Sequence, residues 1–314
     1  MKHIVVAGGG VLGSQIAFQS AYCGFDVTIW LRSEESIGRT APKLAHLKEI
    51  YTETIESMAT PNSVTSPQWA NGIAQFDEFD KQDCLTRVDR AAKSIRLELD
   101  LSKAVADADL VIESMAENPA DKIAFYKTLA PLLPEKAIIA TNSSTLLPSQ
   151  FAKYTGRPKA YLALHFANSI WKNNTAEIMA QSKTDQAVFD AVMAFAKQIR
   201  MVPLPVRKEK SGYLLNSMLV PMLFSALDLY VTGVSDPESI DLAWTLGTGA
   251  PKGPFRILDT VGLTTAHNIV SQYTKIPAFL APYHFREMEA MLRKYLDAGK
   301  LGVASGEGFY RYDN

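Results

Sequence analysis

The feature that most constrains the fold of this chain is a glycine-rich turn close to its N-terminus. An apolar run, Ile4 to Ala7, leads directly into Gly8-Gly9-Gly10-Val11-Leu12-Gly13. Residues Ser14 to Tyr22 have helical character, and a second apolar run covers Val27 to Leu31. The order strand, glycine turn, helix, strand predicts a βαβ unit, which belongs in a parallel sheet covered by helices on both faces.

A glycine turn in this setting is typical of a dinucleotide-binding site. Gly8 permits the tight turn, Gly10 lets the backbone approach a pyrophosphate, and Gly13 lets helix and strand pack closely. The phosphates would lie at the positive end of the helix that begins around Val11 and Leu12. We therefore expect a dinucleotide cofactor, with a purely structural glycine turn as the alternative.

The end of the second strand bears on which dinucleotide is bound. An NAD site usually carries an acidic residue there, whereas this chain has Leu31, followed by Arg32 and Ser33. Nothing would repel a 2′-phosphate, and Arg32 could bind it as a charge-assisted fork while Ser33 donates its hydroxyl. The sequence thus allows NAD(H) or NADP(H) and favours NADP(H), unless Arg32 is a solvated loop residue and Glu34 or Glu35 holds the ribose.

Strands and helices alternate along the first two thirds of the chain. A helical excursion covers about residues 33–93, where we expect breaks at Pro42, Pro61 and Pro67 and a loop around residues 59–75. Apolar runs and helical patterns then predict strands at 95–99, 108–113, 137–141, 160–166 and 202–206, with helices at 119–133 and 185–199. All of these strands would extend one sheet.

The pattern changes after Val206, because no further strand is indicated and residues 213–230 form an apolar-rich segment long enough for a long helix. We predict an α/β protein with a Rossmann-type, doubly wound sheet domain at residues 1–206. An all-helical domain for substrate binding and dimerisation would follow at residues 207–314, the charged run at residues 207–210 marking the boundary.

Composition narrows the function classes. The 32 Lys and Arg balance 33 Asp and Glu, so no basic field steers the chain to nucleic acid or an anionic membrane, and a small-molecule substrate is expected. The N-terminal apolar run is too short for a signal peptide or a spanning helix, which favours a cytoplasmic location. The 2 cysteines show no C-x-x-C spacing, so no metal site is expected.

Three polar segments decide the expected chemistry: residues 141–146, residues 164–168 and residues 175–177. Each is expected beyond the carboxyl end of a predicted strand, where ligands bind in open α/β sheets. Together with residues 117–118, Lys122 and residues 211–216, their order resembles the short-chain 3-hydroxyacyl-CoA dehydrogenase family, in particular its 3-hydroxybutyryl-CoA dehydrogenase and diketoreductase-like members. The resemblance continues through residues 247–255 and 306–310.

The resemblance implies specific roles. His165 would be the general acid/base, Glu177 would orient its ring, and Ser144 and Asn216 would hold the reacting oxygen. Chemistry agrees, since imidazole titrates near neutral pH and hydroxyl and amide groups can stabilise a developing alkoxide. The nicotinamide half of the cofactor site would be lined by Glu117, Lys122, Asn142, Ser144 and Asn168. Dimerisation through the second domain is also implied, the alternative being a central core helix of a monomer.

The segment after His165 departs from the family, which continues with Phe-Asn-Pro and a Met-rich stretch. Here residues 166–174 include Trp171, Lys172, Asn173 and Asn174, which suggest more polar substrate recognition. A CoA thioester, a free keto acid, a diketo ester and a sugar acid all remain open as substrates. Basic residues of the excursion, namely Arg39, Lys43 and Lys48, could bind CoA phosphates or simply form a solvated helix face.

Two other interpretations compete with a hydroxyacyl dehydrogenase. A 3-hydroxyisobutyrate or ketopantoate reductase type would share the two-domain plan but would use a catalytic lysine, and the His165–Glu177 spacing and Asn216 argue against it. A non-catalytic, crystallin-like dinucleotide-binding protein is the other alternative. Loss of His165 or Glu177 would support it, but both residues are present.

Overall fold

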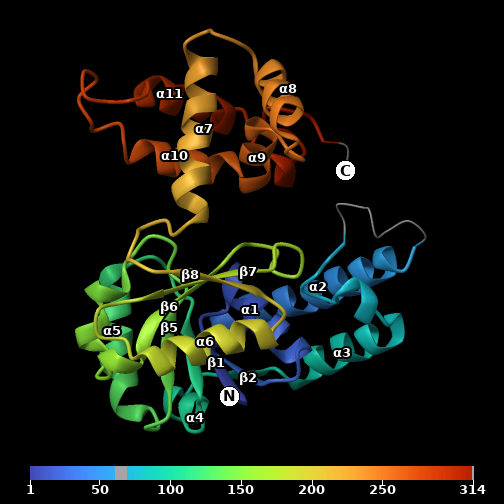
Figure 1. Cartoon of the computed structure of the whole chain (residues 1–314), viewed down its shortest axis with the longest axis vertical. Helices are drawn as coiled ribbons and strands as arrows, with labels where there is room; N and C mark the ends of the chain where they lie inside the picture. Colours follow the sequence, from blue (N-terminus) through green and yellow to red (C-terminus); the bar gives the residue numbers. More distant parts are fainter. Residues whose placement is uncertain (61–68, 313–314) are drawn as a thin grey trace. The chain divides into compact units, whose positions relative to one another are not determined.

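The protein is described by a computed structural model that covers residues 1–60 and 69–312. The chain forms two compact units, Met1–Leu214 and Leu215–Asn314 (Figure 1). The boundary predicted between residues 206 and 207 lies in the same connecting stretch, after the last strand and before the first helix of the second unit. Each unit is described by itself below.

The first unit is built on one sheet. Among the described residues it has 8 strands in the order β3-β2-β1-β4-β5-β6-β7-β8, and all neighbours are parallel except β6 and β7. The strands are β1 (His3–Ala7), β2 (Asp26–Trp30), β3 (Arg96–Glu98), β4 (Leu110–Glu113), β5 (Ile138–Thr141), β6 (Tyr161–Phe166), β7 (Thr175–Ala180) and β8 (Val202–Val206). The predicted α/β sheet domain with a helical second domain is confirmed.

Helices cover both faces of the sheet (Figure 1). One face is covered by α1 (Val11–Tyr22) and α6 (Gln186–Gln198), and α2 (Glu34–Met58) and α3 (Lys81–Ser94) pack against α1 and share the same core. The other face packs against α4 (Leu101–Val105) and α5 (Pro119–Leu129). Alternation along β1 shows the two cores, because Ile4 and Val6 join the first and Val5 and Ala7 join the second. Burial on both sides explains why the strands read as continuous apolar runs.

Short 3-10 helices complete the first unit: Phe76–Glu78, Ala130–Leu132, Pro148–Gln150, Ala152–Tyr154 and Pro158–Ala160. The sheet ends at β8, whose sequence Val-Pro-Leu-Pro-Val carries prolines at Pro203 and Pro205. Proline cannot donate a ladder hydrogen bond, so it is tolerated on an edge strand and discourages pairing with another chain.

Two details differ from the sequence-based expectations. Residues 175–177 were expected beyond a strand, but Thr175–Ala180 is itself a strand, β7, antiparallel to β6. The expected break at Pro42 is also wrong, because α2 runs through it. Pro42 is exposed, and the buried residues Leu47 and Tyr51 anchor the helix despite the lost hydrogen bond. Pro61 and Pro67 lie outside the described residues.

The second unit is helical, as expected. It contains α7 (Leu215–Val231), α8 (Pro237–Thr248), α9 (Pro254–Val261), α10 (Leu263–Ser271), α11 (Phe285–Asp297) and a 3-10 helix at Val303–Ser305. Its core is apolar, with Phe255, Leu258 and Met288 at its centre. Within the described part of the chain, we find no helix that combines the length and the apolar character needed to cross a membrane.

Candidate active site

The glycine turn has the backbone geometry that a bound dinucleotide requires. A Cβ atom on Gly13 would lie 2.1 Å from the carbonyl oxygen of Gly8, so only glycine lets α1 approach β1 this closely. A Cβ atom on Gly10 would meet nothing within 4 Å. Gly10 is also the N-cap of α1 and supplies no side-chain cap, so the first N–H groups of this helix face an open space suited to a phosphate.

A pocket of about 200 Å³ lies beside this turn. Its lining comes from the turn, the end of β2, the first turns of α2 and the end of β4: Gly8, Gly9, Gly10, Trp30, Leu31, Arg32, Ser36, Arg39, Thr40, Lys43, Ser114, Met115 and Ala116. Val11 is exposed at the start of α1. The open helix terminus and the pocket together fit the adenosine and pyrophosphate part of a dinucleotide, and we call this pocket the adenosine pocket.

The residues after β2 occupy distinct positions. Leu31 is buried, and its N–H donates to the carbonyl of Glu98 at 2.9 Å. Arg32 is exposed and lines the pocket. Ser33 is the N-cap of α2, where its hydroxyl oxygen accepts from the N–H of Ser36 at 3.3 Å. Glu34 and Glu35 do not line the pocket.

His165 and Glu177 face each other across an antiparallel strand pair. The register of β6 and β7 pairs His165 with Glu177, so their side chains project from the same face at neighbouring positions. Glu177 Oε2 lies 2.9 Å from His165 Nδ1, and Ser144 Oγ lies 3.2 Å from His165 Nε2. Both members of the pair are buried, at 5% and 3% exposure, so the carboxylate acts on the imidazole with little screening by water.

Tyr213 and Leu214 hold this pair from one side. The Tyr213 ring stacks on His165 with 4.5 Å between ring centroids and an interplanar angle of 17°. Its hydroxyl donates to the carbonyl of Ser143 at 2.8 Å, and the Leu214 N–H donates to Glu177 Oε1 at 2.8 Å. Burial raises the pKa of Tyr213 above its ordinary value, so the phenol stays a neutral donor.

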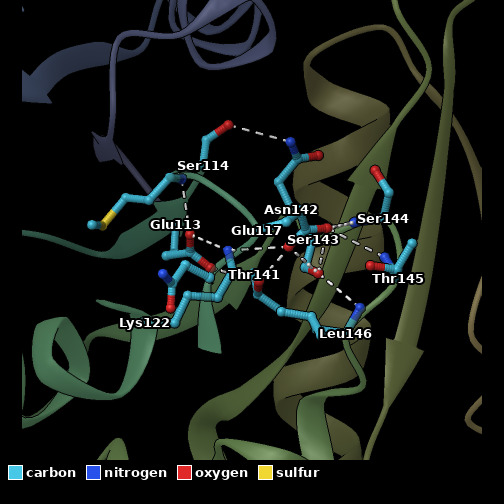
Figure 2. Close-up of polar contacts among 12 residues, drawn as sticks. Glu113, Ser114, Glu117, Lys122, Thr141, Asn142, Ser143, Ser144, Thr145 and Leu146 are labelled. Carbon is cyan, nitrogen blue, oxygen red and sulfur yellow. Dashed lines mark hydrogen bonds and ion pairs between the residues drawn. The ribbon is translucent and has the colours of Figure 1, made fainter. Parts of the chain in front are cut away.

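Glu117 fixes the loop that carries Ser144 (Figure 2). Its carboxylate accepts from the Ser143 hydroxyl at 2.8 Å and from the Ser144 N–H at 2.7 Å. The Ser143 hydroxyl oxygen in turn accepts from the N–H of Leu146 at 3.0 Å. These contacts set the direction of the Ser144 side chain toward His165.

A second buried carboxylate, Glu113, lies at the end of β4 (Figure 2). It accepts from Lys122 Nζ at 2.6 Å, from the Tyr126 hydroxyl at 3.0 Å, from the Thr141 hydroxyl at 2.7 Å and from the Met115 N–H at 2.8 Å. Glu113 and Lys122 are both 0% exposed. Lys122 Nζ also lies 3.6 Å from Glu117, which joins this network to the Ser144 loop.

The amides of the site support its backbone. Asn142 Oδ1 accepts from the Phe166 N–H at 3.1 Å, next to His165, and Asn142 Nδ2 donates to the Ser114 hydroxyl at 3.3 Å. Asn168 is exposed, and its carbonyl accepts from Asn173 Nδ2 at 2.8 Å.

The polar side chains after Asn168 also bond locally. Asn174 Nδ2 donates to the carbonyl of Arg200 at 2.9 Å, and Trp171 is buried at 7% exposure. The polarity of this stretch is therefore used at least partly to build its own loop rather than to bind a substrate.

The structure brings most of the expected catalytic residues together. His165, Glu177 and Ser144 form one contiguous set, whereas Asn216 lies in the first turn of α7 in the second unit and is half-buried. Its role in the reaction stays a prediction. The described residues contain no group of three or more His, Cys, Asp or Glu side chains that could hold a metal ion.

Two residues of the site were given no role from the sequence. Tyr213 was named within the motif 211–216 and at the start of a predicted helix but was given no role, although its ring packs on the His165 imidazole. Gln15 Oε1, on α1, accepts from the Ser169 N–H at 2.9 Å and so holds the loop after β6. The available signal was the pair Gln15 and Gln19, one turn apart on α1, because buried amides need partners.

Comparison with known proteins bears on the whole chain. Residues 3–210 match the family described as "3-hydroxyacyl-CoA dehydrogenase, NAD binding domain", and residues 212–312 match the C-terminal domain of that family. The human mitochondrial hydroxyacyl-coenzyme A dehydrogenase is 31% identical, covering 99% of this chain and 91% of that protein. A 3-hydroxybutyryl-CoA dehydrogenase of Clostridioides difficile is 30% identical over 99% of both chains. A solved structure of a diketoreductase, reported for its catalysis of dicarbonyl compounds, is 45% identical with a TM-score of 0.84 over 99% of both chains.

Proposed function

The chain belongs to the 3-hydroxyacyl-CoA dehydrogenase family, and from this premise we propose that it moves a hydride between a nicotinamide dinucleotide and a 3-hydroxyacyl or 3-ketoacyl substrate, with His165 as general acid/base. It is an oxidoreductase that acts on CH–OH groups and has an NAD-binding domain. The observation that carries the proposal is the buried His165 ring, held between Glu177 and Ser144.

The contacts assign a task to each side chain. Glu177 accepts the Nδ1 proton of His165, which leaves Nε2 as the base, on the side of the ring where Ser144 lies. When the hydroxyl of the substrate is oxidised, Nε2 takes its proton, and the carboxylate of Glu177 stabilises the imidazolium. The bound dinucleotide supplies the hydride acceptor. In the reverse direction the imidazolium returns the proton to the developing alkoxide.

Ser144 and Asn216 are proposed to hold the reacting oxygen. Ser144 is suited to this task because Glu117 fixes its backbone, so its hydroxyl is positioned before the substrate arrives. Asn216 would contribute a second donor from α7. Glu117, Lys122, Asn142 and Asn168 are proposed to surround the nicotinamide half of the cofactor, directly or by positioning the residues that touch it.

The preferred cofactor is proposed to be NADP(H), bound along Gly8, Gly10 and Gly13 at the start of α1. Support comes from position 31, directly after β2, where a buried Leu31 stands in place of a carboxylate, and from Arg32, which lines the adenosine pocket. Ser33 is occupied as the N-cap of α2, so Arg32 is the stronger candidate of the two for a 2′-phosphate.

A second candidate function is the reduction of non-CoA keto acids or diketo esters. It is favoured by the 45% identity to a diketoreductase, which exceeds the identity to the hydroxyacyl-CoA dehydrogenases given above. Both functions use the same hydride transfer and the same His165, and they differ only in what the substrate carries beyond the 3-keto group.

A homodimer formed through the second unit is also proposed. Large apolar side chains are exposed on its helices, including Met218 on α7 and Leu242 and Leu246 on α8, at 66%, 51% and 81%. Covering these side chains would remove apolar surface from water. Light scattering should give twice the monomer mass, and Leu246→Glu should shift it toward the monomer.

Initial rates of NADH and NADPH oxidation test the function, measured with acetoacetyl-CoA and with a matched 3-keto ester that lacks CoA. Turnover of the thioester supports a hydroxyacyl-CoA dehydrogenase, and turnover of the ester alone supports the reductase. Turnover of neither substrate would count against the proposal and favour a non-catalytic, crystallin-like protein.

A further inference from the structure

The lining of the adenosine pocket has an unbalanced charge. Arg32, Arg39 and Lys43 line it, and none of its lining residues is acidic. We propose that Arg39 and Lys43 of α2 complete, with Arg32, a binding site for a phosphomonoester on the adenosine ribose, namely the 2′-phosphate of NADP(H). This inference rests on the proposed function in placing the dinucleotide beside the glycine turn, and it adds the helix that closes the site.

The first turns of α2 are fixed against the glycine turn. The Thr40 hydroxyl lies 3.2 Å from the carbonyl of Gly9 and 2.8 Å from the carbonyl of Ser36, and Thr40 is 1% exposed. Ser36, Arg39 and Lys43 are spaced three and four residues apart, so they lie on one face of the helix. Because Thr40 anchors that region, this face is held at the pocket rather than left free in solvent.

The two cations of α2 are already oriented by local contacts. Arg39 Nη2 donates to the Ser36 hydroxyl at 3.1 Å, and Arg39 Nη1 contacts Glu35. Lys43 Nζ donates to the backbone carbonyl of Arg39 at 2.7 Å, and both residues line the pocket. A doubly charged phosphate between them and Arg32 would receive charge-assisted hydrogen bonds from more than one side.

Glu35 is the competitor for this site. Its side chain is 81% exposed and pairs with Arg39, whose side chain is 57% exposed. Ion pairs this exposed are weak in water, so a phosphate can displace the carboxylate. Glu35 would therefore lower the affinity for a phosphate without preventing its binding, and its removal should strengthen that binding.

The 3′-phosphate of CoA offers the same chemistry as the 2′-phosphate of NADP(H), so the test must separate the two. Calorimetry on the full chain would compare AMP, adenosine 2′,5′-bisphosphate and adenosine 3′,5′-bisphosphate. We expect the 2′,5′-compound to bind about tenfold or more tightly than AMP, because its additional phosphate gains several charge-assisted contacts. The 3′,5′-compound should gain less affinity over AMP than the 2′,5′-compound does.

Variants then locate the effect. Arg39→Ala and Lys43→Ala should each lower the affinity for the 2′,5′-compound by about threefold or more and change the affinity for AMP by less than about twofold. Glu35→Gln should raise the affinity for the 2′,5′-compound. Lys48→Ala is the matched control, because Lys48 lies on the same helix, pairs with Asp89 at 2.8 Å and does not line the pocket. It should leave the affinities for AMP and for the 2′,5′-compound unchanged.

Two results would overturn the inference: a 2′,5′-compound that binds no more tightly than AMP, or one that binds less tightly than the 3′,5′-compound. Unchanged affinity in both Arg39→Ala and Lys43→Ala would remove α2 from the site. Since binding is measured without turnover, these outcomes are independent of whether the enzyme oxidises or reduces a 3-hydroxy or 3-keto substrate.

Discussion

Two buried carboxylates lie in the sheet unit, and they differ in what they are paired with. Glu113, at the end of β4, faces the ammonium of Lys122, together with donors from Tyr126 and Thr141. Glu177, on β7, faces the imidazole of His165, which has a second ring nitrogen available for another partner. The first pair is closed to solvent, whereas the far nitrogen of His165 meets the half-buried Ser144.

We infer that the Glu113–Lys122 pair stabilises the fold and that the Glu177–His165 pair takes part in the reaction. In the Glu113–Lys122 pair the carboxylate is surrounded by donors and holds β4 and α5 together. A buried His–Glu pair can take a proton at one ring nitrogen while its charge is balanced at the other. Glu117 connects the two regions, since it lies near Lys122 and holds the Ser144 loop.

The largest effect on stability is expected from Lys122→Met. The substitution leaves Glu113 buried without its cation, which should cost about 3–5 kcal/mol in the free energy of unfolding measured with urea. Lys127→Met, at an exposed position of the same helix, is the control. A loss of less than about 1 kcal/mol with weakened dinucleotide binding would instead make Lys122 a binding residue.

Glu177→Gln tests the second pair. The amide keeps the size of the carboxylate but cannot stabilise an imidazolium, so kcat should fall by about ten- to hundredfold while the free energy of unfolding changes less than in Lys122→Met. Steady-state rates and urea unfolding of the same preparation measure both. If stability fell as much as in Lys122→Met with kcat retained, the two pairs would serve the same purpose.

Glu117→Gln should give an intermediate result. Gln retains an acceptor for the Ser143 hydroxyl and the Ser144 N–H but weakens both contacts, and we expect kcat to fall by about tenfold. The decisive readout is kcat with saturating substrate and cofactor. An unchanged kcat would show that the Ser144 loop needs no support from Glu117.

The smallest effect is expected from Tyr213→Phe, which removes the hydroxyl bonded to the Ser143 carbonyl and keeps the ring on His165. Stability should fall by about 1 kcal/mol. The raised pKa of Tyr213 means that the folded state holds the phenol proton more tightly. The contribution of the neutral phenol to the free energy of unfolding should be complete below about pH 10 and decline above it.

Urea unfolding of Tyr213→Phe and of the unaltered protein between pH 6 and pH 11 measures this contribution. A stability difference that already declines between pH 6 and pH 9 would contradict it. Tyr213→Leu, which also removes the ring, should lower kcat further than Tyr213→Phe if stacking positions His165.

Much of the fold could be predicted because its strands are buried on both faces. Continuous apolar runs such as Ile4 to Ala7 and the glycine turn that follows leave few alternatives to a parallel sheet. Strand β7 could not be predicted, since Ala176, Glu177 and Met179 are not typical strand residues; it exists because β6 and β8 pair with it on both sides.

The same missed strand explains what the sequence left out of the site. His165 and Glu177 were both identified as functional residues, but not that they face each other in adjacent antiparallel strands. The contact of Tyr213 with His165 was not predicted, because it depends on a turn before α7, where Tyr213 has φ of 53°, and not on any periodic pattern. Contacts between segments that are far apart in the chain cannot be predicted from local sequence patterns.

The central claim is that His165 moves a proton during hydride transfer, and His165→Gln tests it most directly. The rate of NAD(P)H oxidation with the better of the two 3-keto substrates should fall by about 10²–10⁴-fold, with unfolding by urea close to that of the unaltered protein. A fall of less than about tenfold in a folded variant would contradict the account, because a general acid/base cannot be removed at so small a loss.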